Sequence, residues 1–315
     1  MDRPVPISRG DALVAGFTDR ELHGAAWRRV RRGSYIEAEG AAELTAEERH
    51  LVLTNAVVQA SSPDATVSHV SASIAHGLTM WGVPLSRVHL ARDRSTGGRA
   101  TRQVVLHSMR IDADEIVRVG DLSVTSVART VIDLARTVPF EQAVVAGDSA
   151  LRLGKATRAE LAEQLARSVG RPGVPAARRV VDFLDGRSES AGESRSRVAM
   201  RAVRLPAPEL QAHILTPDHQ EVARVDFLFP ELGVIGEFDG LVKYRAALRG
   251  TRSPEDVVIA EKAREDALRA LGWIVIRWTW RELETPHEWL TRLTRAAQIA
   301  HPTTRIGTWI PAPRI

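Results

Sequence analysis

Two kinds of hydrophobic spacing alternate along the chain and predict an α/β fold. In some stretches apolar residues recur every three to four positions, which is the period of an amphipathic helix. In others they alternate with polar residues, which is the period of a half-buried strand. We therefore expect helices and strands in mixed order, an α+β arrangement overall. The clearest helices should begin at Thr45, Ser126 and Ser190 and span 259–271, and the clearest strands should lie at 87–91, 103–107, 223–229, 234–239 and 273–280.

Changes in composition divide the chain into four predicted parts. Residues 1–36 form a short, basic, helical head that ends in a hairpin pattern, and residues 37–187 form a mixed α/β middle domain. The polar run Gly186–Gly192 is typical of a linker, and we expect a third domain over 188–300. Residues 301–315 contain three prolines and are expected to form a loose tail.

Composition narrows the possible functions. The 315 residues include no cysteine, which excludes disulfides, a cysteine nucleophile and thiolate metal sites. No apolar run approaches 18 residues and the start does not resemble a signal peptide, so we expect a cytoplasmic protein without a membrane partner. Of the 43 basic residues 40 are arginines, yet the formal net charge is only +4. That charge permits a nucleic-acid partner without indicating one.

The head has the pattern of a winged helix-turn-helix. A helix over Ser8–Gly16 is followed by a capping box at Thr18–Glu21, which opens a second helix, and Gly33 supplies the turn of a hairpin. Arginines on such a wing can contact phosphates of double-stranded DNA while the second helix enters the major groove. The alternative is a solvated charge run on an ordinary helical subdomain. The candidate DNA-binding residues are Arg28, Arg29, Arg31 and Arg32.

Several segments resemble AbiEi-type antitoxins and their actinobacterial relatives. In the head these segments are 16–18 (Gly-Phe-Thr) and 32–35 (Arg-Gly-Ser-Tyr), and in the middle domain they are 68–72 and 125–130. The resemblance implies a DNA-binding head, autorepression, and a toxin–antitoxin or defence context. It also implies that the middle domain is a scaffold, to which we assign no chemistry.

Two histidines of the middle domain are possible metal ligands. His69 and His76 lie seven positions apart, nearly two helical turns, so they can share a face of a helix. No third ligand stands nearby at a spacing typical of zinc sites. We therefore expect both histidines to be structural.

The third domain carries the clearest chemical pattern. Val225, Phe227 and Phe229 should share one face of a strand, which places Asp226 on the other. Glu237 and Asp239 project from one side of the returning strand, so the hairpin can bring three carboxylates together. Such a set needs a cation, and oxygen ligands favour Mg²⁺ or Mn²⁺, which can activate water against a phosphodiester. The alternative is that these acids sit at strand ends and pair with arginines.

Two more residues extend this candidate site. Glu193 lies in the first turn of the helix that Ser190 opens, so it is either the N3 member of a capping box or a site residue. The helix over 259–271 buries an apolar stripe and leaves Lys262 on or beside its polar face. Arg264 cannot act as a base at neutral pH.

The order of elements and motifs over about 188–293 resembles the Vsr-like domain-of-unknown-function family of the PD-(D/E)XK superfamily. The matching segments include Val225-Asp226, 237–240 (Glu-Phe-Asp-Gly) and 271–277. The resemblance implies a restriction-endonuclease-like core in which Glu193, Asp226 and Glu237 hold the metal. The superfamily has a lysine where this chain has Asp239. Lys262 is our first choice for that missing role and Lys243 the second.

These observations lead to two functional hypotheses. The first is a DNA-binding protein whose third domain is a Mg²⁺-dependent endonuclease, with Glu193, Asp226, Glu237, Asp239 and Lys262 as its catalytic residues. The second is a non-catalytic regulator of antitoxin type that retains a degenerate nuclease fold, and the missing lysine keeps this hypothesis open. An RNA-directed nuclease is a weaker third option. The sequence does not predict the oligomeric state.

Overall fold

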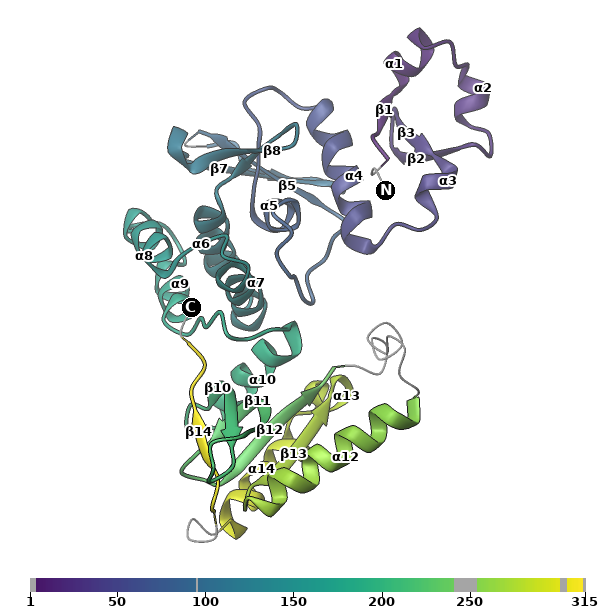
Figure 1. Ribbon diagram of the computed structural model, residues 1–315. Coiled ribbons are helices and arrows are strands. Elements are labelled where there is room, and N and C mark those ends of the chain that lie inside the picture. Colours follow the sequence, from purple (N-terminus) through teal and green to yellow (C-terminus); the bar gives the residue numbers. More distant parts are fainter. Residues whose placement is uncertain (1–3, 95, 241–253, 301–304, 314–315) are drawn as a thin grey trace. The chain divides into compact units, whose positions relative to one another are not determined.

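The computed structural model describes residues 4–94, 96–240, 254–300 and 305–313 (Figure 1). The chain has an α/β fold, as expected, and divides into two compact units. Unit 1 comprises residues 1–150 and 154–183, and unit 2 comprises residues 151–153 and 184–315. The predicted head and middle domain thus belong to one unit. Among the described helices, none combines the length and the apolarity that crossing a bilayer requires.

The head follows the predicted order of elements, but its helices are short. Ser8 caps the first helix, Thr18 and Glu21 form the predicted capping box, and Gly33 makes the hairpin turn with a φ of 74°. Ala12, Leu22 and Tyr35 form a small core between the helices and a sheet of order β1-β3-β2. The elements are β1 Ile7–Ser8, α1 Arg9–Val14, α2 Asp19–Leu22, β2 Trp27–Arg31 and β3 Ser34–Glu37.

The rest of unit 1 is built on a six-stranded sheet of order β6-β7-β5-β4-β9-β8 (Figure 1). Side chains such as Val67, Leu90 and Val124 pack with α4 and α5 to form its core. Strands β5 and β7, both predicted, are parallel neighbours. The elements are α3 Ala38–Ala41, α4 Ala46–Gln59, β4 Thr66–Val67, α5 His69–Ala75, β5 Val88–Asp93, β6 Arg99–Ala100, β7 Val104–Met109, η1 Ala113–Glu115, β8 Ile116–Val119 and β9 Leu122–Thr125.

Four helices complete unit 1 and enclose a buried network of charges. The side chain of Arg129 is fully buried and donates through Nε to Asp133 Oδ2 at 2.7 Å and through Nη1 to Glu115. Arg136 donates to the other oxygen of Asp133, at 2.9 Å, and Gln164 donates to Glu115 at 2.6 Å. Between them, Arg129 and Arg136 thus donate to both carboxylates, and Arg167 also lies 3.9 Å from Glu115. The helices are α6 Val127–Thr137, α7 Phe140–Arg152, α8 Arg158–Arg167 and α9 Val174–Val181.

Unit 2 is a five-stranded sheet of order β13-β12-β11-β10-β14 with a hydrophobic core on each face. One core joins the sheet to α10 and α14, where Trp278 stacks on Trp289 at 4.2 Å, and the other joins it to α12 through Leu268. The elements are α10 Ala191–Ala202, β10 Glu209–Leu215, β11 Glu221–Phe229, β12 Val234–Asp239, α12 Pro254–Ala270, β13 Ile274–Thr279, α13 Trp280–Glu284, α14 His287–Ile299 and β14 Thr308–Ile310.

The prediction that Val225, Phe227 and Phe229 share one apolar face of strand β11 is wrong. Val225 packs in the α12 core, whereas Phe227 and Phe229 pack in the core of α10 and α14. The change of face occurs at Asp226, opposite Gln211 on β10, which has a left-handed φ of 55° and is 4% exposed. Because a non-glycine residue with this φ breaks the strand's regular alternation, the sequence pattern alone does not reveal the switch.

Two predicted irregular segments are also structured. The polar run over 186–192 is not a loose linker: Arg187 and Ser188 are buried, and Arg187 pairs with Asp185 at 2.8 Å. The boundary between the units falls instead at residues 183 and 184. The tail is not wholly loose either, because β14 pairs antiparallel with β10. Both segments also gain order from partners distant in sequence, Glu209 for Arg187 and β10 for β14, which local composition does not indicate.

Candidate functional site

The acidic residues expected to form a site come from three neighbouring elements of unit 2. Glu193 lies in the first turn of α10, Asp226 at the change of face in β11, and Glu237 in β12. Helix α10 lies close to β12 because residue 192 is glycine: a Cβ there would stand 1.9 Å from Phe238 Cε1. A larger residue at position 192 would therefore move Glu193 away from the sheet.

Glu193 is both a capping residue and part of this acidic group. Its carboxylate accepts hydrogen bonds from the backbone N–H of Glu189 at 2.8 Å and from Ser190 Oγ at 2.8 Å. It also accepts from Gln211 Nε2 at 2.9 Å. Burial, followed by the charge of Asp226, raises the pKa of Glu193 to about 7. The pKa of Glu193 is therefore raised in part by a second carboxylate, and a residue that serves only as a helix cap needs no such neighbour.

Asp226 lies between the other two acids. Its Oδ2 accepts a hydrogen bond from the backbone N–H of Phe238 at 2.8 Å. Burial raises the pKa of Asp226 to about 6, with a further contribution from the charge of Glu237, while hydrogen bonds from Phe238 and Gln211 and the charge of Arg264 act in the opposite direction. Asp226 therefore interacts electrostatically with Glu193 on one side and with Glu237 on the other.

Glu237 has a different environment, in which both carboxylate oxygens are held by arginines. Arg264 Nη2 donates to Oε1 at 2.6 Å, and Arg277 Nε donates to Oε2 at 2.9 Å. Arg277 also pairs with Glu261 at 2.9 Å and Glu265 at 3.3 Å. The alternative of strand acids paired with arginines thus describes Glu237, but not Glu193 or Asp226.

The other residues that the sequence predicted for this site are Asp239, Lys262 and Lys243, and their surroundings differ from those of the three acids. Asp239 is half-buried at the end of β12 and paired in register with Thr279. Lys262 is exposed on α12. With about 100° per residue, Lys262 lies about 200° around the helix from Arg264, the residue that reaches Glu237. Lys243 lies outside the described residues.

We name the three acids Glu193, Asp226 and Glu237 the acid row, because the charge of Asp226 acts on Glu193 and the charge of Glu237 acts on Asp226. Among the described residues, the group whose potential ligand atoms all lie within 4.8 Å of one another is a set of histidines, and the acid row is not such a group. Mg²⁺ is commonly held by one or two carboxylates together with water and substrate phosphate. The adjacent carboxylates of Glu193 and Asp226 fit that donor set, because neither is paired with an arginine in the described chain.

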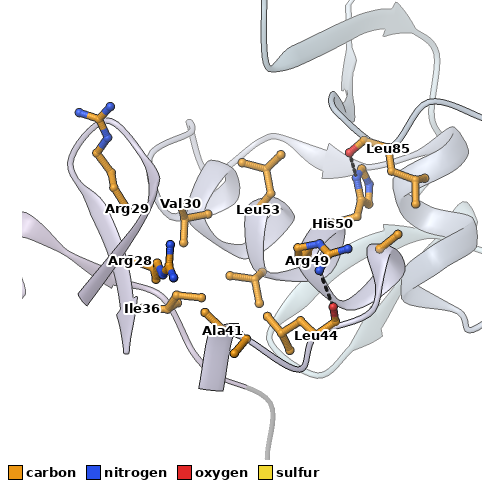
Figure 2. Close-up of a pocket in the computed structure, with 13 residues that line it drawn as sticks. Arg28, Arg29, Val30, Ile36, Ala41, Leu44, Arg49, His50, Leu53 and Leu85 are labelled. Carbon is orange, nitrogen blue, oxygen red and sulfur yellow. Dashed lines mark hydrogen bonds between the residues drawn. The ribbon is translucent and has the colours of Figure 1, made fainter. Parts of the chain in front are cut away.

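The four wing arginines have unequal surroundings. Arg28, Arg29 and Arg32 are exposed, whereas Arg31 is half-buried and donates to the backbone carbonyl of Ala56 in α4 at 3.2 Å. Arg28 and Arg29 also border a cavity of about 620 Å³ between the hairpin and α4 (Figure 2). Its apolar walls include Val30, Ile36, Leu44, Leu53 and Leu85. Three of the four arginines are therefore accessible to a phosphate backbone, and one anchors the hairpin.

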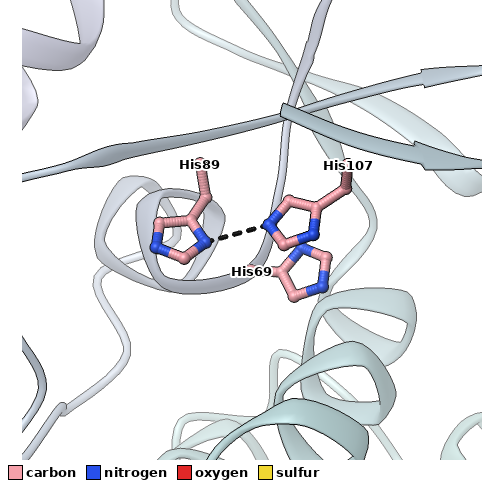
Figure 3. A group of neighbouring side chains, drawn as sticks. All are labelled: His69, His89 and His107. Atoms are coloured by element: carbon pink, nitrogen blue, oxygen red, sulfur yellow. Dashed lines mark hydrogen bonds between the residues drawn. The ribbon is translucent and has the colours of Figure 1, made fainter. Parts of the chain in front are cut away.

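Sequence reasoning missed a group of histidines in unit 1, which we name the histidine trio: His69, His89 and His107 (Figure 3). His89 Nδ1 lies 3.1 Å from His107 Nε2, and the ring of His69 stacks on that of His107 with centroids 3.7 Å apart. Burial lowers the pKa of His89 and of His107 to about 4 and lowers the pKa of His69 well below its usual value. His76, the expected companion of His69, instead contacts the carbonyl of Thr125 at 2.7 Å.

A signal for the trio was present in the sequence. His89 lies inside a predicted strand, His107 is the last residue of another, and His69 follows a third strand. Spacing along one helix does not reveal the group, because the three residues meet across neighbouring strands of a sheet. Strand order, which brings β5 and β7 together, is not readable from local periodicity.

No family model matches the chain. Two relatives from Mycobacterium tuberculosis, the uncharacterized proteins MT2308 (strain CDC 1551 / Oshkosh) and Rv2248 (strain ATCC 25618 / H37Rv), are 33% identical over 178 residues. The match covers 56% of this chain and 62% of each relative, less than two thirds of their length. The crystal structure of the RV2827C protein from Mycobacterium tuberculosis matches 66% of this chain and 80% of its own, at 15% identity and a TM-score of 0.39.

Proposed function

We propose that this protein binds double-stranded DNA through its head and that unit 2 is a restriction-endonuclease-like, Mg²⁺-dependent phosphodiesterase domain. The observation that carries the proposal is the buried pair of Glu193 and Asp226, two acids raised in pKa by burial and by neighbouring carboxylates without an arginine between them. Buried like charges are costly unless they serve a ligand or a reaction, and perturbed acids concentrate at functional sites.

The order of elements in unit 2 supports the same proposal. A helix carrying Glu193 is followed by antiparallel strands carrying Asp226 and Glu237, then by α12 and a strand parallel to β12. This order agrees with the PD-(D/E)XK resemblance found in the sequence. Glu193 and Asp226 would hold a Mg²⁺ ion, which when bound would stabilise charge on a phosphodiester as a Lewis acid. Gln211 keeps the two carboxylates oriented, and Phe238 N–H fixes one oxygen of Asp226.

Nicking of supercoiled plasmid by the full chain tests the proposal. We expect nicking in Mg²⁺ or Mn²⁺, its loss in EDTA, and its loss in Asp226→Asn, because the asparagine cannot supply the charge that a cation needs. Glu231→Gln is the matched control, since Glu231 is exposed in the turn between β11 and β12. Intact plasmid with both metals, using a protein that binds DNA, would exclude the nuclease.

The surroundings of Glu237 favour a second candidate, a non-catalytic DNA-binding regulator of antitoxin type. Both oxygens of Glu237 are bound to arginines, and the described part of the chain brings no lysine to the row. If the protein is such a regulator, we expect the full chain to bind DNA with the same affinity in EDTA and in Mg²⁺. The Asp226→Asn substitution should leave that affinity unchanged. Binding to its own promoter region is then the expected activity.

The wing can be tested separately from the row. Replacing Arg28, Arg29 and Arg32 together should weaken DNA binding and reduce the salt dependence of the association constant, by roughly one unit of slope for each DNA phosphate that the variant no longer neutralises. Arg31→Met should instead lower the stability of unit 1, since Arg31 is tied to the carbonyl of Ala56. A salt slope that is unchanged in the triple variant would remove the wing from the interface. Adding Arg31→Met to that variant should not change the slope further.

A further inference from the structure

We propose that the histidine trio is a binding site for a divalent transition metal of the zinc class, held by three imidazoles with its fourth position open. The site lies in unit 1 and is independent of the acid row and of the function proposed for it. The rings of His69, His89 and His107 offer one nitrogen each, all within 4.8 Å of one another.

The sheet brings the three residues together in a fixed arrangement. His89 lies on β5 and pairs with Val105 on the parallel strand β7, so His107, two positions further on, projects from the same face. His69 is the first residue of α5, which begins immediately after β4 and packs against β5. Two ligands thus come from rigid neighbouring strands and the third from a helix start (Figure 3).

The spacing of the nitrogens suits a tetrahedral ion. With zinc–nitrogen bonds of about 2.0–2.1 Å, two nitrogens of a tetrahedral site stand about 3.3–3.4 Å apart. His89 Nδ1 and His107 Nε2 are 3.1 Å apart, close to that separation. A bound ion would replace the hydrogen bond between these two rings by two metal–nitrogen bonds.

His69 has two features beyond its position in the trio. Its ring Nδ1 contacts the buried hydroxyl of Ser68 at 3.0 Å, leaving Nε2 for a ligand bond, and metal-binding histidines commonly anchor their other nitrogen in this way. Its backbone has a left-handed φ of 49°, although it is not glycine. Strained conformations of this kind concentrate at functional sites.

The charges around the trio are compatible with a cation. Arg129 and Arg136 are the positive groups that act on His69, and both are paired with carboxylates of the buried network. His50 and Arg87 act on His89. His69 is 2% exposed, while His89 and His107 are only half-buried, so an ion can enter from the strand side. Three neutral imidazoles without a carboxylate or thiolate favour Zn²⁺, Co²⁺, Ni²⁺ or Cu²⁺ over Mg²⁺.

Titration of the untagged, demetallated full chain with Zn²⁺ and Co²⁺ tests the site. We expect calorimetry to show one tight equivalent of Zn²⁺, and Co²⁺ to give the visible absorption of a tetrahedral nitrogen-ligated ion. His89→Gln and His107→Gln should each weaken Zn²⁺ binding at least about 100-fold, since changes one shell further out already cost 10- to 100-fold. His76→Gln, a buried histidine outside the trio, is the matched control and should bind as the wild type does.

Several outcomes separate this site from other causes of binding. Zn²⁺ should raise the melting temperature of the wild type, and Asp226→Asn should retain that increase, since the acid row is elsewhere in the chain. If the trio variants fail to fold, the Co²⁺ spectrum of the wild type still reports whether the ligands are tetrahedral nitrogens. Absence of a tight equivalent, an octahedral Co²⁺ spectrum, or unchanged Zn²⁺ affinity in folded His89→Gln and His107→Gln would each overturn the proposal.

Discussion

Two groups of buried charged side chains, one in each unit, are balanced in different ways. In unit 1, Arg129 and Arg136 neutralise Glu115 and Asp133, and the guanidinium of Arg129 also donates to the carbonyl of Arg110. In unit 2, the two arginines near the acid row both bind Glu237. The other two acids of the row have only neutral hydrogen-bond donors in the described chain.

This difference indicates which of the two groups of buried charges needs a proton or a bound cation to be stable. A buried network in which each carboxylate is paired with an arginine and accepts hydrogen bonds requires no ligand. Two neighbouring buried carboxylates that accept hydrogen bonds only from neutral donors bind either protons or a cation. We therefore infer a structural role for the Arg129 network, and this difference is the reason for proposing a binding role for Glu193 and Asp226.

The largest expected loss of stability follows from removing Arg129 from the buried charge network of unit 1. Arg129→Met leaves the carboxylates of Glu115 and Asp133 buried with fewer partners, and removing one member of a buried ion pair typically costs about 3–5 kcal/mol. We expect calorimetry to show a decrease of this size in the free energy of unfolding of unit 1. Arg118→Met, at an exposed arginine, should change it by less than about 0.5 kcal/mol. A decrease as small as the control's would show that these carboxylates do not depend on Arg129.

The close approach of α10 to the sheet gives the next largest effect. In Gly192→Ala the new methyl group meets the ring of Phe238, and overpacking of this kind costs about 1–3 kcal/mol. Urea unfolding of unit 2 measures it. Gly10→Ala makes the same chemical change in α1, where the nearest atom to the new Cβ is 3.6 Å away, and should leave stability unchanged or slightly higher. Equal effects in both variants would mean that Gly192 does not position Glu193.

The two units should respond to pH in opposite directions. In the folded chain Glu193 and Asp226 bind protons more tightly than their unfolded forms, with pKa values of about 7 and 6 against 4.5 and 3.8. Their contribution to stability is full below the unfolded values and is lost as the pH rises towards 7. His89 and His107 have pKa values lowered from 6.5 to about 4, so their contribution is full above 6.5 and is lost as the pH falls.

Because the two contributions oppose each other, a variant is needed to separate them. Between pH 5 and pH 7.5, in EDTA, Glu193→Gln should gain about 1–2 kcal/mol of stability relative to the wild type, since a pKa difference of one unit corresponds to about 1.4 kcal/mol. Urea unfolding at the two pH values measures this. Glu231→Gln, at an exposed acid, should follow the wild type. A Glu193→Gln curve parallel to the wild type would mean that Glu193 is an ordinary cap.

Local signals in the sequence predicted the elements well. The caps at Thr18, Thr45 and Ser126 and the hairpin turn at Gly33 are confirmed, because each depends on residues within one turn of the chain. The acids of the row were also found, since each belongs to a short local motif: the capped first turn of a helix for Glu193 and the two strands of a hairpin for Asp226 and Glu237. Whether they act as a site remains a prediction.

What failed depended on long-range structure. The face switch at Asp226 arises from the left-handed backbone of Gln211 on another strand, and the histidine trio arises from strand order. The order of the segment over 186–192 comes from partners such as Asp185 and Glu209, and β14 is held by β10. None of these contacts leaves a periodic pattern in its own segment.

Replacing Lys262 should have the smallest effect on stability and nicking. The variant is informative because the sequence predicted that this lysine completes the acid row. Lys262 is exposed and lies on the side of α12 away from Arg264, so Lys262→Met should change stability by less than about 0.5 kcal/mol. It should also leave plasmid nicking unchanged. Arg264→Met is the matched comparison, because it removes one of the two guanidinium groups that hold Glu237 and should change nicking. Suppose instead that Lys262→Met abolished nicking while Arg264→Met did not. Helix α12 would then have to turn during the reaction, and the contacts of the arginines with Glu237 would belong to an inactive state of the acid row.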